Sequence, residues 1–232
     1  MKARKLIPIA VALLALAACT PRTTGQPGSH RSTSPAPRTA QEPVESPAAE
    51  SSAESSSEGP AGVDSRLVLS RRDIPGARWR AAGVPDDPGW SFALTGCAVY
   101  EPGDYPAQRH RAAVRAAAFS QGHGRGVLLL VERYADGWAD QAMADIRRVL
   151  EACPRYQAAD VLSSHTIEAE AFAGDDSLLV RSDHIRADEQ PQQWWTAVVR
   201  QGELVATITG TALTEAEVRR IAAAQALRLA AA

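Results

Sequence analysis

The stretch QWWTAVVRQGELVATITG, residues 193–210, decides the fold of this chain. It holds two runs rich in β-branched and aromatic residues, 193–200 and 204–210, on either side of Gln201-Gly202. Such runs are typical of strands, and a glycine in the connection tolerates the positive φ that a tight hairpin turn requires. The stretch therefore predicts an antiparallel hairpin.

Four more strands are expected on the N-terminal side of this hairpin. They are residues 111–119, 126–134, 161–169 and 177–184. The first two are joined by the glycine-rich segment 120–125, so we expect a second hairpin there. Residues 81–106 are rich in proline and glycine, which predicts long loops with a little structure around residues 91–94.

Two helices complete the pattern. Apolar residues recur at helical spacing over residues 137–152, where Asp136 is a candidate N-cap and Pro154 cannot continue the helix. Thr214 and Glu217 form a capping-box pattern ahead of a terminal helix of about four turns. We therefore expect an α+β fold of two layers, in which an antiparallel β-sheet is packed on one side by two main helices.

The first twenty residues carry the pattern of an export signal. Basic residues precede the apolar run 6–18, which is shorter than the roughly 20 residues of a membrane-spanning helix, so residues 1–18 are expected to be a removable signal peptide. The run ends in Leu-Ala-Ala-Cys at residues 16–19, which resembles the bacterial lipobox. This resemblance implies that Cys19 is linked to diacylglycerol and becomes the first mature residue. An ordinary signal peptide with an incidental cysteine is the alternative.

Residues 19–63 are expected to be the lipidated cysteine and a disordered tether. The segment from Thr20 to Val63 has no aromatic and almost no aliphatic side chains, so it cannot bury enough apolar surface to offset chain entropy. All five tryptophans, four tyrosines and three phenylalanines lie after it. We therefore expect residues 64–232 to form one globular domain.

Charge and motifs exclude several classes of function. The chain has 25 cationic and 27 acidic residues, and removal of the signal peptide takes away three of the cationic ones. A mildly acidic, exported chain without a long basic run is not expected to bind nucleic acid. The sequence has no nucleophile elbow, zinc-protease motif, Walker loop or dinucleotide fingerprint. We expect no enzymatic activity, no metal site and no cofactor.

Three further features are weak candidates for a site. Gly122-His123-Gly124-Arg125-Gly126 can form an anion-binding nest, although a hairpin tip is the favoured interpretation. Asp175 and Asp176 are adjacent, but neighbours on an extended chain point in opposite directions, so a turn is favoured over paired carboxylates. The histidines of the domain lie at unrelated spacings, which favours scattered positions over a metal cluster. They are His110, His123, His165 and His184.

Cys97 and Cys153 are the two cysteines that remain when Cys19 carries lipid. Disulfides persist outside the cytoplasm, so we expect these two to pair. Free structural thiols and a metal pair are the alternatives. The bond would hold the loop around Cys97 against the end of the first helix, with a stabilisation of roughly 4 kcal/mol in the chain-entropy model.

Trp194 and Trp195 are adjacent in a predicted strand, so one is expected in the core and the other outward or in a cleft. An outward tryptophan offers a contact for a ligand or a partner. Both rings are therefore candidate ligand-binding residues. The alternative is a strand that is covered on both faces.

Several short elements follow one another in a recognisable order between Leu67 and Leu229. They are residues 69–76 (LSRRDIPG), Cys97, the strand residues 131–134, residues 152–154 (ACP), 174–177 (GDDS) and 198–204 (VVRQGEL). In order and spacing these elements resemble the PknH-like extracellular sensor domains, named after the actinobacterial serine/threonine kinase H. Domains of this family also occur as free-standing lipoproteins.

The resemblance implies a twisted antiparallel sheet with helices, and a cleft for an unidentified ligand outside the cell. It implies no catalytic residues, and two disulfides where this chain has one cysteine pair. We expect a non-catalytic, sensor-like domain that is held by lipid at the extracytoplasmic face of the cell membrane. Its partner would be a small molecule, a lipid, a cell-wall fragment or an envelope protein.

Two other functions stay open. One is a protein-interaction lipoprotein of the cell envelope whose cleft is packed shut. The other, less favoured, is an envelope hydrolase, which would require Asp175, Asp176 or His184 to cluster with a serine.

Overall fold

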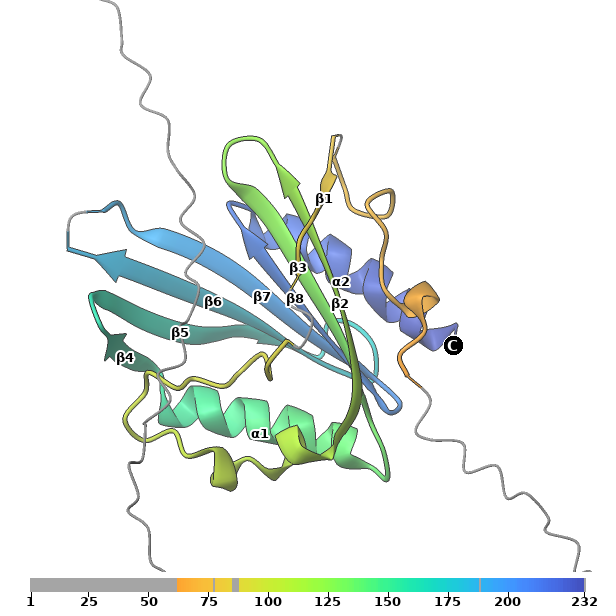
Figure 1. Ribbon diagram of the computed structural model, residues 1–232, viewed down its shortest axis with the longest axis horizontal. Coiled ribbons are helices and arrows are strands. Elements are labelled where there is room, and N and C mark those ends of the chain that lie inside the picture. Colours follow the sequence, from red (N-terminus) through yellow and green to blue (C-terminus); the bar gives the residue numbers. More distant parts are fainter. Residues whose placement is uncertain (1–61, 77, 85–87, 188, 232) are drawn as a thin grey trace, which may run out of the picture. The chain divides into compact units, whose positions relative to one another are not determined.

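The structure, a computed structural model, describes residues 62–76, 78–84, 88–187 and 189–231 (Figure 1). The signal peptide, Cys19 and nearly all of the tether lie outside the described residues, so they stay predictions. Val63, which we assigned to the tether, is 4% exposed and packs in an apolar cluster.

The described residues form one antiparallel sheet of eight strands in the order β1-β2-β3-β8-β7-β6-β5-β4 (Figure 1). The strands are β1 (Arg80–Ala82), β2 (Arg111–Gln121), β3 (Arg125–Tyr134), β4 (Arg155–Ala158), β5 (Val161–Glu170), β6 (Asp176–Arg186), β7 (Gln192–Gln201) and β8 (Leu204–Thr211). The predicted hairpin β7-β8 lies at the centre of the sheet. All six predicted strands are present, whereas β1 and β4, with three and four residues, were not foreseen.

The turn between β7 and β8 confirms the expected role of Gly202, whose φ is +56°. Gln201 pairs with Leu204 across the turn, so the hairpin closes over two residues. The backbone N–H of Gly202 donates a hydrogen bond of 2.8 Å to the carboxylate of Asp175. The turn before β6 thus supports the turn after β7.

Two α-helices and three short 3-10 helices complete the described residues. The α-helices are α1 (Trp138–Ala152) and α2 (Glu215–Ala230), and the 3-10 helices are Ser65–Leu67, Pro102–Asp104 and Pro106–His110. The capping box of α2 is confirmed: the N–H of Glu217 donates to the hydroxyl of Thr214, and the N–H of Thr214 donates to the carboxylate of Glu217. None of these helices has the length and apolar composition needed to cross a membrane.

The expected N-cap of α1 is wrong. Gly137 occupies that position with a φ of +79°, and no side chain caps the helix. Asp136 precedes it with a φ of +55°. Two consecutive residues in the left-handed region turn the chain sharply between β3 and α1, so the carboxylate of Asp136 lies one residue too early to cap.

The two α-helices cover opposite faces of the sheet (Figure 1). Ala197 and Val199 of β7 lie in the apolar cluster around α2, whereas Val198 between them lies in the cluster around α1. The neighbouring strand β6 repeats this division, because Leu179 belongs to the cluster around α2 and its two neighbours belong to the other. Alternate side chains of the central strands therefore point to different helices.

The α+β class, the antiparallel sheet, the two main helices and the single disulfide are confirmed. The placement of both helices on one face is corrected. The central strands carry unbroken apolar runs such as Leu178-Leu179-Val180, and a strand that is apolar on both faces has to be covered on both.

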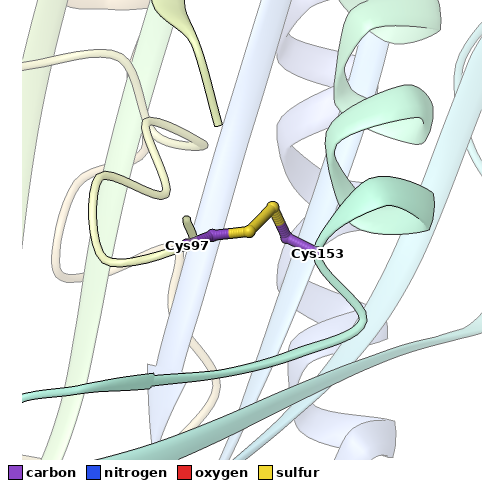
Figure 2. Close-up of a disulfide and its surroundings, with 2 residues drawn as sticks. All are labelled: Cys97 and Cys153. Atoms are coloured by element: carbon purple, nitrogen blue, oxygen red, sulfur yellow. A yellow bond between two sulfur atoms is a disulfide. The ribbon is translucent and has the colours of Figure 1, made fainter. Parts of the chain in front are cut away.

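The Cys97–Cys153 disulfide holds the loop that closes the cluster around α1 (Figure 2). The two Cα atoms lie 6.1 Å apart, and both cysteines are buried. The loop contributes four aromatic side chains to this cluster: Trp90, Phe92, Tyr100 and Tyr105. The predicted pairing is confirmed, and it joins a segment with little regular structure to the C-terminal end of α1.

Candidate functional site

Trp194 and Trp195 point to opposite faces of β7, as predicted from strand alternation. Trp195 is 9% exposed and belongs to the cluster around α2. Trp194 is only partly buried and lies on the other face, beyond the part that α1 covers. Its ring lies 4.5 Å, between centroids, from the ring of His184 on β6. Trp194 is thus the outward member of the pair.

A repeated Ser-x-His motif lies beside Trp194. Ser163 and His165 on β5 pair in register with His184 and Ser182 on β6. Each serine therefore faces the histidine of the other strand. The hydroxyl of Ser163 and Nδ1 of His184 share a hydrogen bond of 3.0 Å, and Nδ1 of His165 and the hydroxyl of Ser182 share one of 2.8 Å.

Four rings form a row across strands β4 to β7, which we call the aromatic row: Tyr156, His165, His184 and Trp194. The centroids of successive rings lie 5.7, 6.2 and 4.5 Å apart. Side chains that face one another on adjacent strands of one sheet face are close enough to touch. The row therefore leads from β4 across the sheet to the partly exposed ring of Trp194.

Both imidazoles of the aromatic row are neutral at neutral pH. Burial, and then the neighbouring His184, lowers the pKa of His165 from 6.5 to about 4. Burial also lowers the pKa of His184, although the carboxylate of Asp183 opposes the shift. Nε2 of His165 is buried and has no hydrogen-bond partner among the described residues. The neutral ring of His184, next to Trp194, suits an uncharged group better than an anion.

A pocket of about 180 Å³ opens beside Trp194. It is lined by Val161, His184, Arg186, Glu189, Gln190, Gln192 and Trp194. The two charged side chains among these described residues pair with each other, since the guanidinium of Arg186 donates to the carboxylate of Glu189 at 3.2 Å. Drug-sized ligands occupy pockets of about 300–1,000 Å³. This pocket therefore fits one ring-sized group of a larger ligand.

The two carboxylates of Asp175 and Asp176 are not brought together. Asp175 accepts hydrogen bonds from the β7-β8 turn, whereas Asp176 accepts two from the guanidinium of Arg147 on α1. Both have structural partners, as the turn interpretation predicts. The described residues hold no group of three or more side chains suited to a metal ion.

The expectation of scattered histidines is wrong for two of the four. His110 stacks on Trp138 and His123 lies at the tip of the β2-β3 hairpin, but His165 and His184 are half-buried neighbours. Sequence reasoning missed this pair. The signal was present, because Ser-x-His occurs twice with the spacing that places both side chains on one face of a strand.

Comparisons with known proteins support the fold alone. No family model matches the sequence, and no curated protein matches it. Among solved structures, the crystal structure of the extracellular domain of PknH from Mycobacterium tuberculosis aligns with a TM-score of 0.50 and 11% sequence identity. The alignment covers 75% of this chain and 100% of that one.

A second solved structure, a putative uncharacterized protein (Rv0999 ortholog) from Mycobacterium smegmatis, aligns with a TM-score of 0.33 and 10% identity over 56% of this chain and 75% of that one. We draw nothing from that weaker likeness. The fold of this chain is thus similar to that of a kinase's extracellular domain.

Proposed function

We propose that this chain is a lipid-anchored, extracytoplasmic binding module whose ligand contacts the exposed side of Trp194. The observation that carries the proposal is the pocket beside Trp194 and His184, at the end of the aromatic row. A large ring on a rigid strand offers contact area with little loss of side-chain entropy on binding. The function is recognition without chemistry.

The chemistry of the pocket favours an uncharged ligand group with an apolar face. The guanidinium of Arg186 pairs with the carboxylate of Glu189 and also lies 3.4 Å from that of Asp160, so its positive charge is already offset and does not favour an anionic ligand. Gln190 and Gln192 also line the pocket, are exposed, and supply amide donors and acceptors. A sugar ring of a cell-wall fragment has this combination of an apolar face and hydrogen-bonding edges, so it is the ligand class that we propose.

Three observations support an extracytoplasmic, anchored location. Residues 16–19 match the lipobox pattern. The Cys97–Cys153 disulfide is of the kind that persists outside the cytoplasm. The fold is similar to that of an extracellular domain. Together they support a sensor-like domain that is tethered at the outer face of the cell membrane.

The hydrolase alternative gains one observation, the hydrogen bond between Ser163 and His184. A nucleophilic serine needs an imidazole that is itself oriented by a third group. Asp183, the carboxylate next in sequence, instead pairs with Arg181 and Gln193. Ser163 and Ser182 are also only 4% and 6% exposed. These contacts support a structural role for the Ser-His pairs, and an active-site probe such as a fluorophosphonate should label neither serine.

The proposal is tested by titrating the mature protein with solubilised cell-wall saccharide fragments while following tryptophan fluorescence. Trp194→Ala should weaken binding at least tenfold and leave the thermal unfolding temperature nearly unchanged. Trp138→Ala is the matched control, because Trp138 is also partly exposed but lies on α1 against His110.

Equal affinities for the wild type and Trp194→Ala would refute the proposal that the ligand contacts Trp194. No binding by either protein would favour the alternative of an interaction lipoprotein without a small ligand. In that case, crosslinking in the envelope should find a protein partner.

A further inference from the structure

A second cavity, larger than the pocket beside Trp194, lies between β1 and the tip of the β2-β3 hairpin. Its volume is about 610 Å³, within the usual range for ligand sites. It is lined by Arg78, Arg80, Ser120, Gln121, Gly122, His123 and Arg125. It shares no residue with the pocket beside Trp194, so the two cavities can be tested separately.

The cavity is cationic. Of the described residues that line it, three are arginines, one is a histidine, and none is acidic. Arg125 forms an ion pair of 2.5 Å with Glu217 of the α2 capping box. Arg78 and Arg80 are exposed and form no ion pair with the described residues. Among the described residues, one carboxylate against three guanidinium groups leaves two positive charges unbalanced.

The sheet holds these cations in place around the cavity. Arg80 pairs in register with Ser120, and Arg125 pairs with Gln121 across the hairpin. The guanidinium of Arg125 also lies 6.0 Å from the ring centroid of Trp79, which is buried. Glu217 and Trp79 therefore fix one guanidinium, and the short strand β1 brings the other two arginines to the same opening.

The hairpin tip completes the cavity. Gln121 ends β2 and Arg125 begins β3, so the turn consists of residues 122–124. His123 and Gly124 have φ values of +67° and +72°. The segment singled out in the sequence as a possible anion-binding loop thus lies beside Arg78 and Arg80, which that pattern did not include.

We propose that this cavity binds a phosphoryl group, carried either by a soluble phosphate ester or by an anionic phospholipid headgroup. The planar guanidinium group matches the oxygen atoms of a phosphate in a bidentate geometry. Two unbalanced guanidinium groups match the charge of a phosphate monoester. Salt screens the attraction between exposed arginines and an anion, so the affinity for phosphate should fall as the ionic strength is raised.

The experiment uses the full mature chain with Cys19→Ser, so that no attached lipid confuses membrane binding. Binding is measured to glycerol phosphate by calorimetry, and to phosphatidylglycerol vesicles against phosphatidylcholine vesicles by cosedimentation. The double variant Arg78→Gln, Arg80→Gln should lose at least tenfold in affinity. Arg71→Gln, Arg72→Gln is the matched control, since it removes the same charge from two exposed arginines outside the cavity.

Each outcome decides the proposal. Binding of glycerol phosphate that depends on Arg78 and Arg80 supports a soluble ester, and binding of anionic vesicles alone with the same dependence supports a headgroup. Equal losses in the two double variants would mean general charge attraction and would overturn the site, as would no binding in either assay. Trp194→Ala should leave these affinities unchanged. A failure of the ligand site proposed beside Trp194 can therefore be distinguished from a failure of the phosphoryl site.

Discussion

Ser163 and His184 face each other across β5 and β6, with the hydroxyl oxygen 3.0 Å from Nδ1. The same arrangement recurs two residues away between His165 and Ser182. The register of β5 against β6 places both imidazoles on one face of the sheet, and the serine hydrogen bonds at Nδ1 fix their orientation. The ring of His184 also lies against Trp194. The hydrogen-bonded pairs thus support the surface to which we assign ligand binding.

The neutral state of His165 makes stability depend on pH. Its pKa is about 4 in the folded chain and 6.5 when unperturbed. Below pH 6.5 the unfolded chain therefore binds more protons than the folded one, so stability falls as the pH falls from about 6.5 to about 4. Because the ring is only partly buried, solvent screening reduces the expected loss to about 1–2 kcal/mol.

Urea unfolding between pH 7 and 4.5 checks this dependence. His165→Gln should flatten the profile, whereas His123→Gln, a change at the exposed hairpin tip, should leave it as in the wild type. His184 contributes in the same direction, so some slope should persist in the first variant. An unchanged profile in His165→Gln would show that the ring is not held neutral by the fold.

The two adjacent tryptophans should differ in their effect on stability. Trp195→Ala removes a ring from the cluster around α2 and should cost about 3–5 kcal/mol. Trp194→Ala removes a partly exposed ring and should cost about 1 kcal/mol or less. Thermal and urea unfolding of both variants measure the difference. Equal destabilisation would contradict the division of the two rings between the faces of β7.

The disulfide should make both cysteines of the domain unreactive toward thiol-labelling reagents. Thiol labelling of the denatured, unreduced protein is expected to modify neither Cys97 nor Cys153. Reduction should lower the free energy of unfolding by up to roughly 4 kcal/mol, because the bond closes a long loop of the unfolded chain. The variant Cys97→Ala, Cys153→Ala is the control and should not respond to reductant. Two labelled sites in the wild type would mean that the bond does not form.

The lipid anchor should depend on Cys19. Cys19→Ser should release the protein from the membrane fraction or leave an uncleaved precursor, because no thiol remains to carry diacylglycerol. Fractionation, followed by intact-mass measurement of the membrane-bound form, checks the result. Unchanged membrane association and unchanged processing would show that another segment holds the protein at the membrane.

Local features of the sequence were predicted correctly because neighbouring residues determine them. The β7-β8 turn requires a positive φ at Gly202, and the start of α2 requires only Thr214 and Glu217. The disulfide followed from the number of cysteines available. The division of Trp194 from Trp195 followed from strand alternation. None of these inferences needs the position of a distant strand.

Only the tertiary structure decided which faces the helices cover and which side chains meet. The apolar runs of β6 and β7 require cover on both faces of the sheet, but they do not say which segment covers which face, because that depends on how the chain crosses the sheet. The pairing of His165 with Ser182 depends on the register of β5 against β6. The cationic cavity depends on β1, a strand of three residues whose pairing with β2 has no local signal. Contacts of this kind join residues far apart in the chain, so their free energy comes from packing and register rather than from local propensity.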